Sequence, residues 1–248
     1  MKRFIAVQHS YSEFLGAIEK QLENRGIGFT YFRPFTGQSL PASALQYDAL
    51  WLLGGAWAPA DREHTPWLDE ELRLLRAFGK ARRPAVGLGF GALLMALAAG
   101  GEPAGDGAPY AYWTTAHATP AGAADPVAQA IDGRQVLVAA SGRVKLPPGT
   151  EPVAVDENGE WIALRHGEAY GLLFRPDLTP GMIEDTIMEE GRPLPDDIGA
   201  VLARARELWP EYRQTSDRVV AALAAGLDLM RERRKPPVFK LHAVSKEP

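Results

Sequence analysis

Short apolar runs alternate with amphipathic stretches along the N-terminal part of the chain. Short apolar runs predict buried strands at residues 4–7, 49–53 and 84–88, and residues 27–32 read as a further strand that ends before Pro34. Helical spacing of apolar positions predicts helices over residues 12–25 and 67–80, and residues 89–99 form a helix with almost no charge. Strands that alternate with helices are typical of a mostly parallel sheet covered on both faces.

The pattern changes after residue 100. Residues 100–133 are rich in Gly, Pro, Ala and Thr and have the weakest pattern in the chain. Strand-like runs return at residues 135–139, 152–155, 161–165 and 169–174, separated by tight turns, which predicts a small antiparallel meander.

The last quarter of the chain is helical in pattern. Asp196 and Asp197 precede a helix expected to run to about Leu208, and Pro210 separates it from a second helix over 216–233. This helical pair packs on the core or docks on a partner chain. The segment from Arg231 onward is expected to be a solvated tail.

Composition matters chiefly through one absence. The 248 residues are 46% hydrophobic and 23% charged, as in an ordinary globular protein, but none is cysteine. The chain therefore has no disulfide, no cysteine-ligated metal and no thiolate nucleophile. The five histidines show no metal-ligand spacing, so neither metal nor cofactor is expected.

Charge and hydropathy limit the partners. The net charge of −4 provides no basic field for nucleic acid. The N-terminus lacks the apolar core of a signal peptide, and no run reaches the roughly 18 apolar residues of a membrane span. We therefore expect a cytoplasmic protein that binds neither nucleic acid nor membrane.

A strand, a sharp turn and a buried helix follow one another at residues 84–99. In α/β enzymes such an elbow holds a nucleophile at the helix N-terminus, where free N–H groups and the helix dipole stabilise negative charge. Here the tip of the elbow is Gly89. The run from Gly87 to Ala92 also fits a dinucleotide fingerprint formally, but it follows the fourth strand and lacks the acidic partner, so a nucleotide-binding module is the weakest hypothesis.

Several segments around this elbow resemble the class I glutamine amidotransferases in order and spacing. They are Trp51-Leu-Leu-Gly-Gly-Ala-Trp57, Pro66-Trp67-Leu68, residues 84–91, Ala98-Ala-Gly-Gly101, Leu146-Pro-Pro-Gly149 and Tyr170-Gly-Leu-Leu-Phe-Arg-Pro-Asp177. The resemblance covers about residues 1–190 and implies a flavodoxin-like three-layer α/β sandwich. A small antiparallel excursion is expected between about residues 110 and 174, and residues 191–248 would form a helical extension with a basic tail.

The resemblance also implies a degenerate catalytic triad. Gly89 occupies the position of the family's cysteine, Arg175 that of its histidine and Asp177 that of its glutamate. Two positions just after the elbow, which are polar in the family, are occupied by Ala92 and Leu93 in this chain. Glycine has no nucleophile and arginine cannot be deprotonated in a protein, so cysteine-dependent glutamine hydrolysis is predicted to be absent.

The oxyanion hole of the family is made by backbone N–H groups, which survive loss of side chains. One hypothesis is that such donors and Arg175 form a pocket for a small carboxylate or phosphate. That pocket would comprise Gly54, Gly55, Ala56, Gly89, Phe90 and Arg175. The alternative is that Arg175 pairs with Asp177 or Asp61 and fills the former site.

Two main functions remain open. The chain is either an inactive homologue acting as a subunit, regulator or ligand-binding module, with a protein partner or a second copy, or an enzyme with a different chemistry. In the second case it would be a hydrolase or lyase acting on a glutamyl-like amide, with His9, Asp61 or His64 activating water. Ser10 and Ser12 have no identifiable base. The histidines are otherwise ordinary surface or hydrogen-bonded residues.

Overall fold

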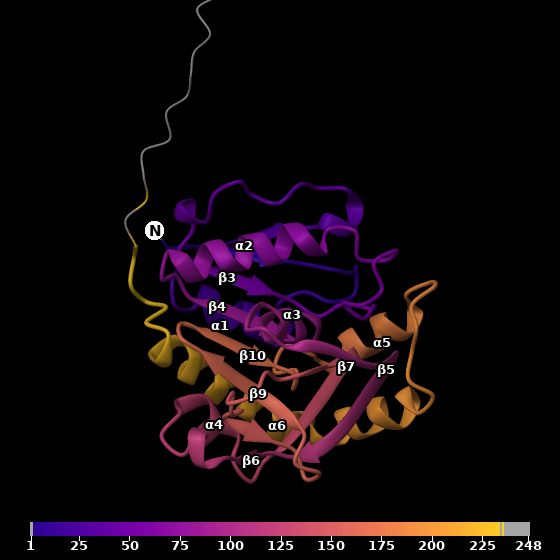
Figure 1. Cartoon of the computed structure of the whole chain (residues 1–248). Helices are drawn as coiled ribbons and strands as arrows, with labels where there is room; N and C mark the ends of the chain where they lie inside the picture. Colours follow the sequence, from indigo (N-terminus) through magenta and orange to yellow (C-terminus); the bar gives the residue numbers. More distant parts are fainter. Residues whose placement is uncertain (1, 234, 236–248) are drawn as a thin grey trace, which may run out of the picture.

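A mixed eight-stranded sheet forms the centre of the computed structural model, which describes residues 2–233 and 235 (Figure 1). Its order is β2-β1-β3-β4-β10-β9-β8-β6. The first five strands are parallel and the others antiparallel. The strands are β1 (Lys2–Val7), β2 (Ile27–Phe32), β3 (Ala49–Leu52), β4 (Ala85–Leu88), β6 (His117–Ala118), β8 (Ala154–Val155), β9 (Trp161–His166) and β10 (Ala169–Leu172). The predicted α/β fold with a mostly parallel central sheet is confirmed.

Helices cover both faces of the sheet. They are α1 (Glu19–Glu23), α2 (Leu68–Lys80), α3 (Phe90–Ala98), α4 (Pro126–Ile131), α5 (Pro180–Met188) and α6 (Ile198–Gly226). Alternate residues of β1 enter different cores: Phe4 packs with residues of α1 and α6, and Ile5 packs with residues of α2. Both are fully buried, which explains why the strands read as continuous apolar runs.

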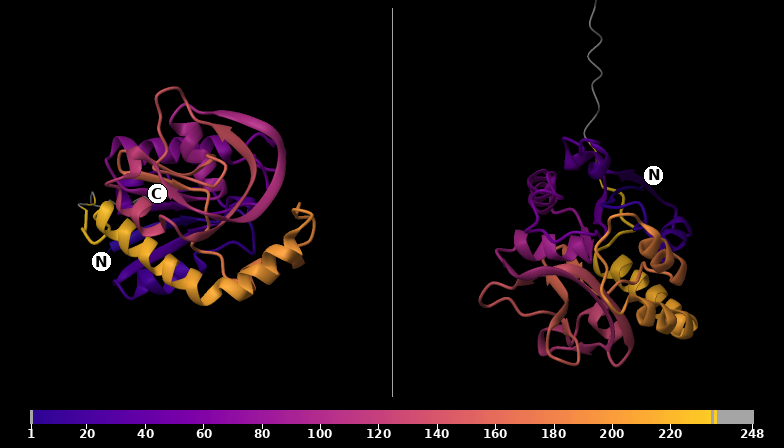
Figure 2. Two further views of the ribbon diagram at one scale, coloured as in Figure 1. Left: turned by 90° about the horizontal axis from the view of Figure 1, so that it is seen from below. Right: turned by 90° about the vertical axis from the view of Figure 1, so that its right-hand side faces the viewer.

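A second sheet of two long antiparallel strands, β5 (Glu102–Thr115) and β7 (Gln135–Lys145), curves along one side of the molecule (Figure 2). The predicted meander is therefore wrong in detail. Its first predicted strand is part of β7 in the second sheet, whereas the other three correspond to β8, β9 and β10 in the central sheet, and the long strand β5 begins earlier, at Glu102. Pro103, Gly105 and Gly107 obscure the alternation in β5, and the register shifts between Ala104 and Pro109. Pairing with the more regular β7 decides the conformation of this segment.

The first predicted helix is shorter than expected. Gly16 has a φ of 50°, outside the right-handed helical region, and starts a 3₁₀ turn, Gly16–Ile18, so that only Glu19–Glu23 is α-helical. The N–H of Ala17 donates to the carbonyl of Asp177 at 3.0 Å. The shortened helix thus secures the segment that carries Asp177.

The predicted break at Pro210 is also wrong, because α6 runs through it for 29 residues. Proline removes one helical hydrogen bond and strains the preceding turn, at a cost of about 3 kcal/mol in an isolated helix. Buried residues on both sides, such as Val201 and Leu223, hold the two halves against the core. The helix bends along its length in the left view of Figure 2, as a proline inside a helix causes.

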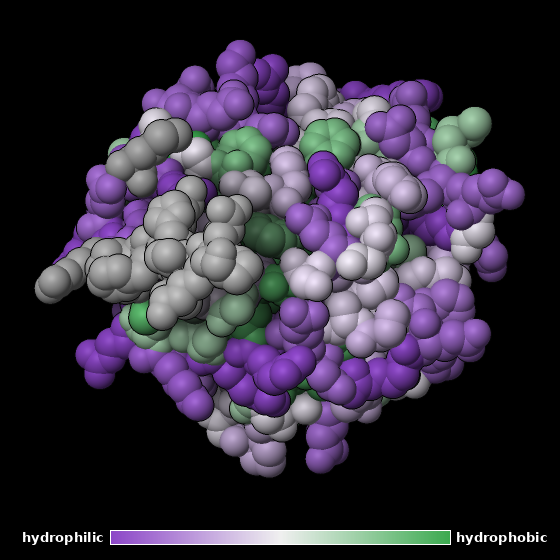
Figure 3. Space-filling model, turned by 90° about the horizontal axis from the view of Figure 1, so that it is seen from above, coloured by the Kyte–Doolittle hydropathy of each residue, from purple (hydrophilic) through white to green (hydrophobic). Residues whose placement is uncertain are grey.

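The C-terminal segment from Arg231 was expected to be a solvated tail. Its described part contacts the body: the Arg233 N–H donates to Asp48 Oδ1 at 2.7 Å, and Lys235 Nζ lies 2.7 Å from Asp48 Oδ2. Residues 236–248 lie outside the described residues. One face of the molecule, shown in Figure 3, is largely hydrophilic with small hydrophobic patches. No described helix is both long and apolar enough to cross a bilayer.

Candidate functional site

The segments that follow four parallel strands meet at one edge of the sheet. Glu13 follows β1, Gly54 follows β3, Gly89 follows β4 and Arg175 follows β10. The carboxyl ends of parallel strands share an edge, so residues far apart in the sequence come together there. Arg175 is fixed further by β7, because its N–H donates to the Leu137 carbonyl at 2.8 Å.

Arg175 is buried and fully engaged by carboxylates. Its Nε and Nη2 donate to the two oxygens of Asp177 at 3.0 and 2.7 Å, and its Nη1 donates to Glu13 Oε1 at 2.5 Å. Burial alone would lower the pKa of Arg175, but the charges of Asp177 and Glu13 outweigh it and raise the pKa. The predicted pairing with Asp177 is confirmed, whereas Asp61 makes its contact elsewhere.

Glu13 connects Arg175 to a second arginine. Arg192 Nη2 donates to Glu13 Oε2 at 2.9 Å, and Arg192 Nη1 donates to the hydroxyls of Ser10 at 3.1 Å and Ser12 at 3.3 Å. Burial raises the pKa of Glu13, but the two arginines outweigh this and lower it to about 2. Glu13, Asp177, Arg175 and Arg192 therefore form a compact network of two carboxylates and two guanidinium groups, which we call the carboxylate–arginine network.

The two glycines beside this network leave room for the guanidinium of Arg175. A Cβ at Gly54 would lie 2.5 Å from Arg175 Nη1 and 2.1 Å from Glu13 Oε1. A Cβ at Gly89 would lie 3.1 Å from Arg175 Nη1 and 2.9 Å from the Ala139 carbonyl oxygen. Gly89 has φ 52° and ψ −109°, the strained type of turn expected at an elbow. Arg175 thus packs against the position at which a nucleophile would project.

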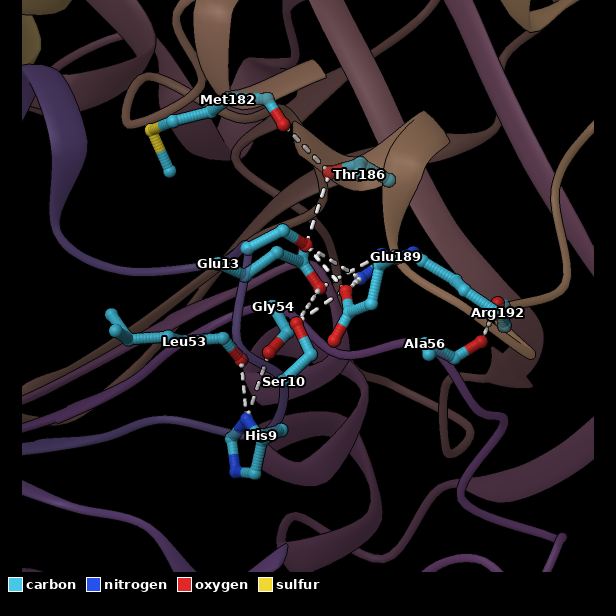
Figure 4. Close-up of polar contacts among 12 residues, drawn as sticks. His9, Ser10, Glu13, Leu53, Gly54, Ala56, Met182, Thr186, Glu189 and Arg192 are labelled. Carbon is cyan, nitrogen blue, oxygen red and sulfur yellow. Dashed lines mark hydrogen bonds and ion pairs between the residues drawn. The ribbon is translucent and has the colours of Figure 1, made fainter. Parts of the chain in front are cut away.

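The loop after β3 is held by side chains on its carbonyl groups (Figure 4). His9 Nδ1 lies 3.0 Å from the Leu53 carbonyl oxygen and 2.9 Å from that of Gly54, and Ser141 Oγ donates to the Ala56 carbonyl at 2.7 Å. In a trans peptide the N–H points opposite to the carbonyl, so the Gly55 N–H points away from His9. These contacts fix the carbonyl groups of Leu53, Gly54 and Ala56 in the loop after β3.

His9 cannot act as a base in this arrangement. Its Nδ1 faces two carbonyl oxygens and its Nε2 lies 2.6 Å from Glu71 Oε1. All these oxygens accept hydrogen bonds, so both ring nitrogens act as proton donors and neither is left to accept a proton. Burial would lower the pKa of His9, but Glu71 outweighs it and raises the pKa. The ring also packs on Phe90, with centroids 4.7 Å apart. Its role here is to hold the loop and the elbow together.

Asp61 and His64 form a separate pair. His64 Nδ1 lies 2.9 Å from Asp61 Oδ2, and its ring stacks on Trp57 with centroids 3.8 Å apart. The hydrogen bond from His64 is the main cause that lowers the pKa of Asp61. The side chain of His64 is 43% exposed and lines an open cavity of about 460 Å³. Neither Asp61 nor His64 joins the carboxylate–arginine network.

Little space remains beside Arg175. A cavity of about 50 Å³ is lined by Gly55, Ser141 and Arg175, and it is bordered by the segment from Arg192 to Pro195. Such a volume holds a few water molecules. Ala56 instead borders the larger cavity beside His64. Of the six residues predicted to bind an anion, all but Ala56 lie together, Phe90 among them, but the cation Arg175 already has two carboxylate partners.

Sequence reasoning missed Glu13 and Arg192, which complete the network. Glu13 stands among polar residues of a loop, and Arg192 lies in a segment without motif, so neither position carries a recognisable signal. Among the described residues no group of three or more His, Asp or Glu side chains could hold a metal ion.

Comparisons with known proteins agree with the motifs. No model of a known protein family matches the chain. A segment of 97 residues, 38% of this chain and 41% of the relative, is 34% identical to the glutamine amidotransferase-like protein YfeJ of Salmonella typhimurium. The match thus spans less than half the length of this curated relative.

Solved structures show the fold over nearly the whole chain. A glutamine amidotransferase from Thermotoga maritima superposes with a TM-score of 0.74 at 20% identity, covering 92% of this chain and 98% of its own. One from Methylobacillus flagellatus gives 0.77 at 19% identity, covering 98% and 100%. PurLQS from Thermotoga maritima gives 0.57 at 13% identity, covering 91% and 99%. The predicted resemblance to class I glutamine amidotransferases is therefore confirmed: the chain has their fold and is similar in sequence to a glutamine amidotransferase-like protein.

Proposed function

We propose that this chain is a glutamine amidotransferase-like protein without cysteine-dependent glutaminase activity that acts as a subunit or regulator of a protein complex. The observation that carries the proposal is the buried Arg175, held by Asp177 and Glu13 against the tip of the elbow at Gly89. Thiol-dependent amide hydrolysis needs a nucleophile, a base that accepts its proton and an orienting group. Only the orienting carboxylate, Asp177, is present, and it is paired with a permanent cation.

The small cavity supports the same proposal. About 50 Å³ beside Arg175 does not accommodate an amino acid, and the segment from Arg192 to Pro195 borders it. A small carboxylate would also have to displace Asp177 or Glu13 from Arg175. A role through protein contacts is therefore favoured over anion binding at this point. Similarity to PurLQS, a multi-subunit complex, is consistent with a protein partner.

An ammonia-release assay with glutamine tests the loss of activity. The purified chain and its Gly89→Cys variant should both release ammonia at the rate of buffer, because Arg175 cannot accept the thiol proton. Release above background by the unmodified chain would overturn the proposal.

The proposed partner role needs its own experiment. Cells of the native host are treated with a lysine-reactive cross-linker, and the full chain is then isolated from them. Its sedimentation is compared with that of the purified chain. A larger species containing a second, identified polypeptide in fixed proportion supports the subunit role. Sedimentation of the native material as the free monomer would contradict it.

A second candidate is hydrolysis of an amide by water activated at His64, which Asp61 orients through the 2.9 Å contact. In this reaction His64 would take a proton from water as the oxygen attacks the carbonyl carbon, and would return it to the leaving amine. The open cavity of about 460 Å³ beside His64 is large enough for a glutamyl-like amide. Hydrolysis of a glutamyl-amide library that is lost in His64→Gln, with Gly89→Cys unchanged, would support this candidate. Absence of any hydrolysis excludes it.

A further inference from the structure

A groove lies at the edge of the sheet opposite to the carboxylate–arginine network. It has a volume of about 530 Å³ and lies at the beginning of β4 and β10, where Ala85 and Ala169 line it. One wall is the last part of α2, and the other is the turn between β9 and β10. The volume falls within the range of about 300–1,000 Å³ that is typical of small-molecule sites.

Apolar side chains line the inside of this groove. Leu75 comes from α2, Met95 and Ala98 come from α3, and Leu164 comes from β9. Gly79 contributes no side chain, and nothing lies within 4 Å of the position that a Cβ would take there. An apolar molecular body can therefore lie between α2 and the β9–β10 turn.

Positive charge lies along the wall formed by α2 and the turn after it. Arg76, Lys80 and Arg82 line the groove, and all three are exposed. Within residues 2–233 and 235 no hydrogen bond or ion pair is found for their side chains, unlike Arg83, which donates to the Tyr47 carbonyl. Glu168 is the carboxylate on the opposite wall, beside His166. The balance of charge at the opening is positive.

The backbone at the end of α2 directs one of these cations. Arg82 has a φ of 49°, a conformation that glycine usually supplies where a helix ends. The N–H groups of Arg82 and Arg83 donate back to the carbonyls of Gly79 and Phe78 at 3.0 Å, which stops the helix here. The chain thus carries arginine at a position where glycine would be less strained.

We propose that this groove binds a small organic anion with an apolar body, such as an acyl chain that ends in a carboxylate or phosphate. Arg76, Lys80 and Arg82 bind the anionic group, and Leu75, Met95, Ala98 and Leu164 contact the apolar body. The site is separate from the network around Arg175 and does not rest on the proposed function. Its three cations have no carboxylate partner to displace, in contrast to Arg175.

Isothermal titration calorimetry of the full chain at low salt tests this site. The probes are decanoate and decyl phosphate, which share the apolar chain and differ in the anionic group, with decanol and decyltrimethylammonium as the neutral and cationic counterparts. Saturable binding of either anion with one site per chain, and clearly weaker binding of the other two probes, is expected. Comparison of the two anions identifies the preferred head group.

Variants locate the binding. Arg76→Glu and Arg82→Glu should each weaken binding of the better anion by about tenfold, because each replaces an attraction by a repulsion. Arg73→Glu, on the same helix but outside the groove, is the matched control; when the titrations are repeated at about 0.15 M salt, where charges are screened over about 8 Å, it should weaken binding less than either groove variant. Glu168→Gln should strengthen binding. Gly79→Trp should block it without unfolding α2, since the position is open and tryptophan has a higher helix propensity than glycine.

Three outcomes would overturn the proposal. The first is that neither anion binds saturably. The second is equal binding of the cationic probe. The third is affinity that survives both Arg76→Glu and Gly79→Trp. A concentration-dependent dimer that Gly79→Trp abolishes would assign the groove to a second copy of the chain instead.

Discussion

At the scale of single residues, Arg175 neutralises two buried carboxylates, and one of these, Glu13, is 162 positions away in the sequence. Each side chain in the trio is at most 2% exposed. A buried charge without its partner costs several kcal/mol, whereas a complete pair is close to neutral for stability. The arginine is therefore needed because the two carboxylates are present.

The first prediction follows for Arg175→Leu. Removal of the cation leaves Glu13 and Asp177 close together and partly uncompensated, so the free energy of unfolding should fall by about 3–5 kcal/mol. Urea unfolding measures the loss. Arg206→Ala, which removes an exposed pair with Glu184, is the control and should change stability by less than about 1 kcal/mol. Equal effects of the two variants would contradict a buried network.

A second prediction concerns the tip of the elbow. Gly89→Ala should lower the free energy of unfolding by about 1–3 kcal/mol, because the residue has a positive φ and its Cβ would crowd the Ala139 carbonyl and Arg175. Gly26→Ala is the matched control: its φ is 64°, but no atom lies within 4 Å of the new Cβ. Thermal or urea unfolding of both variants separates the backbone cost from crowding. A loss no greater than that of Gly26→Ala would mean that Arg175 does not pack against the tip of the elbow.

At the scale of elements, the segment between α5 and α6 borders the remaining cavity and is held there by Arg192. This arginine contacts Ser10, Ser12 and Glu13 in the loop after β1, and Glu189 at the end of α5. The segment thus joins the loop after β1 to the C-terminal helices. The ion pairs of Arg192 with Glu13 and Glu189, rather than an apolar face, hold the segment between α5 and α6 in position.

The third prediction is that Arg192→Ala loosens this segment. Amide exchange over residues 189–195 should accelerate, and the free energy of unfolding should fall by about 1–3 kcal/mol, because Glu13 loses one of its two cations. Hydrogen-exchange mass spectrometry provides the measurement. Arg204→Ala, which breaks an exposed pair within α6, should leave exchange of this segment unchanged. Unchanged exchange in both variants would show that the segment is held by other contacts.

At the scale of the whole molecule, two buried ion pairs should make stability depend on pH in opposite directions. Glu13 has its pKa lowered from about 4.5 to about 2, so its contribution is fully present above pH 4.5 and is lost as the pH falls toward 2. His9 has its pKa raised above 6.5, so its contribution is present below pH 6.5 and is lost as the pH rises through the higher value. Stability should therefore be greatest between these limits.

The fourth prediction tests the acid limb with Glu13→Gln. The unmodified chain should lose about 3 kcal/mol from this carboxyl between pH 4.5 and pH 2, and the variant should show a correspondingly shallower loss. For the alkaline limb, Glu71→Gln removes the charge that holds the proton on His9, so the decline above pH 6.5 should weaken. Urea titrations across pH measure both limbs. Parallel pH profiles of the variants and the unmodified chain would contradict the assignment.

The expected division at residue 190, the cytoplasmic location and the protein partner stay predictions. The α/β class, the mostly parallel sheet and the elbow at Gly89 were predictable, because burial on both faces produces continuous apolar runs and helices show their own period. The absence of cysteine and the residues at the triad positions could likewise be read directly. These properties depend on the identity of a residue and its near neighbours.

Only the tertiary structure decided what Arg175 does. Its partner Glu13 is 162 positions away in the sequence, and Arg192 is 179 positions away from Glu13. Pairs of residues so far apart leave no periodic pattern in a single sequence. The same holds for β5, whose glycines and prolines conceal a strand that pairing with β7 stabilises, and for α6, where packing on both sides outweighs Pro210. The sequence determined that the chain has no cysteine and that glycine stands at the tip of the elbow. The fold determined what fills its place, because burial and pairing of charge depend on contacts that form only when distant segments meet.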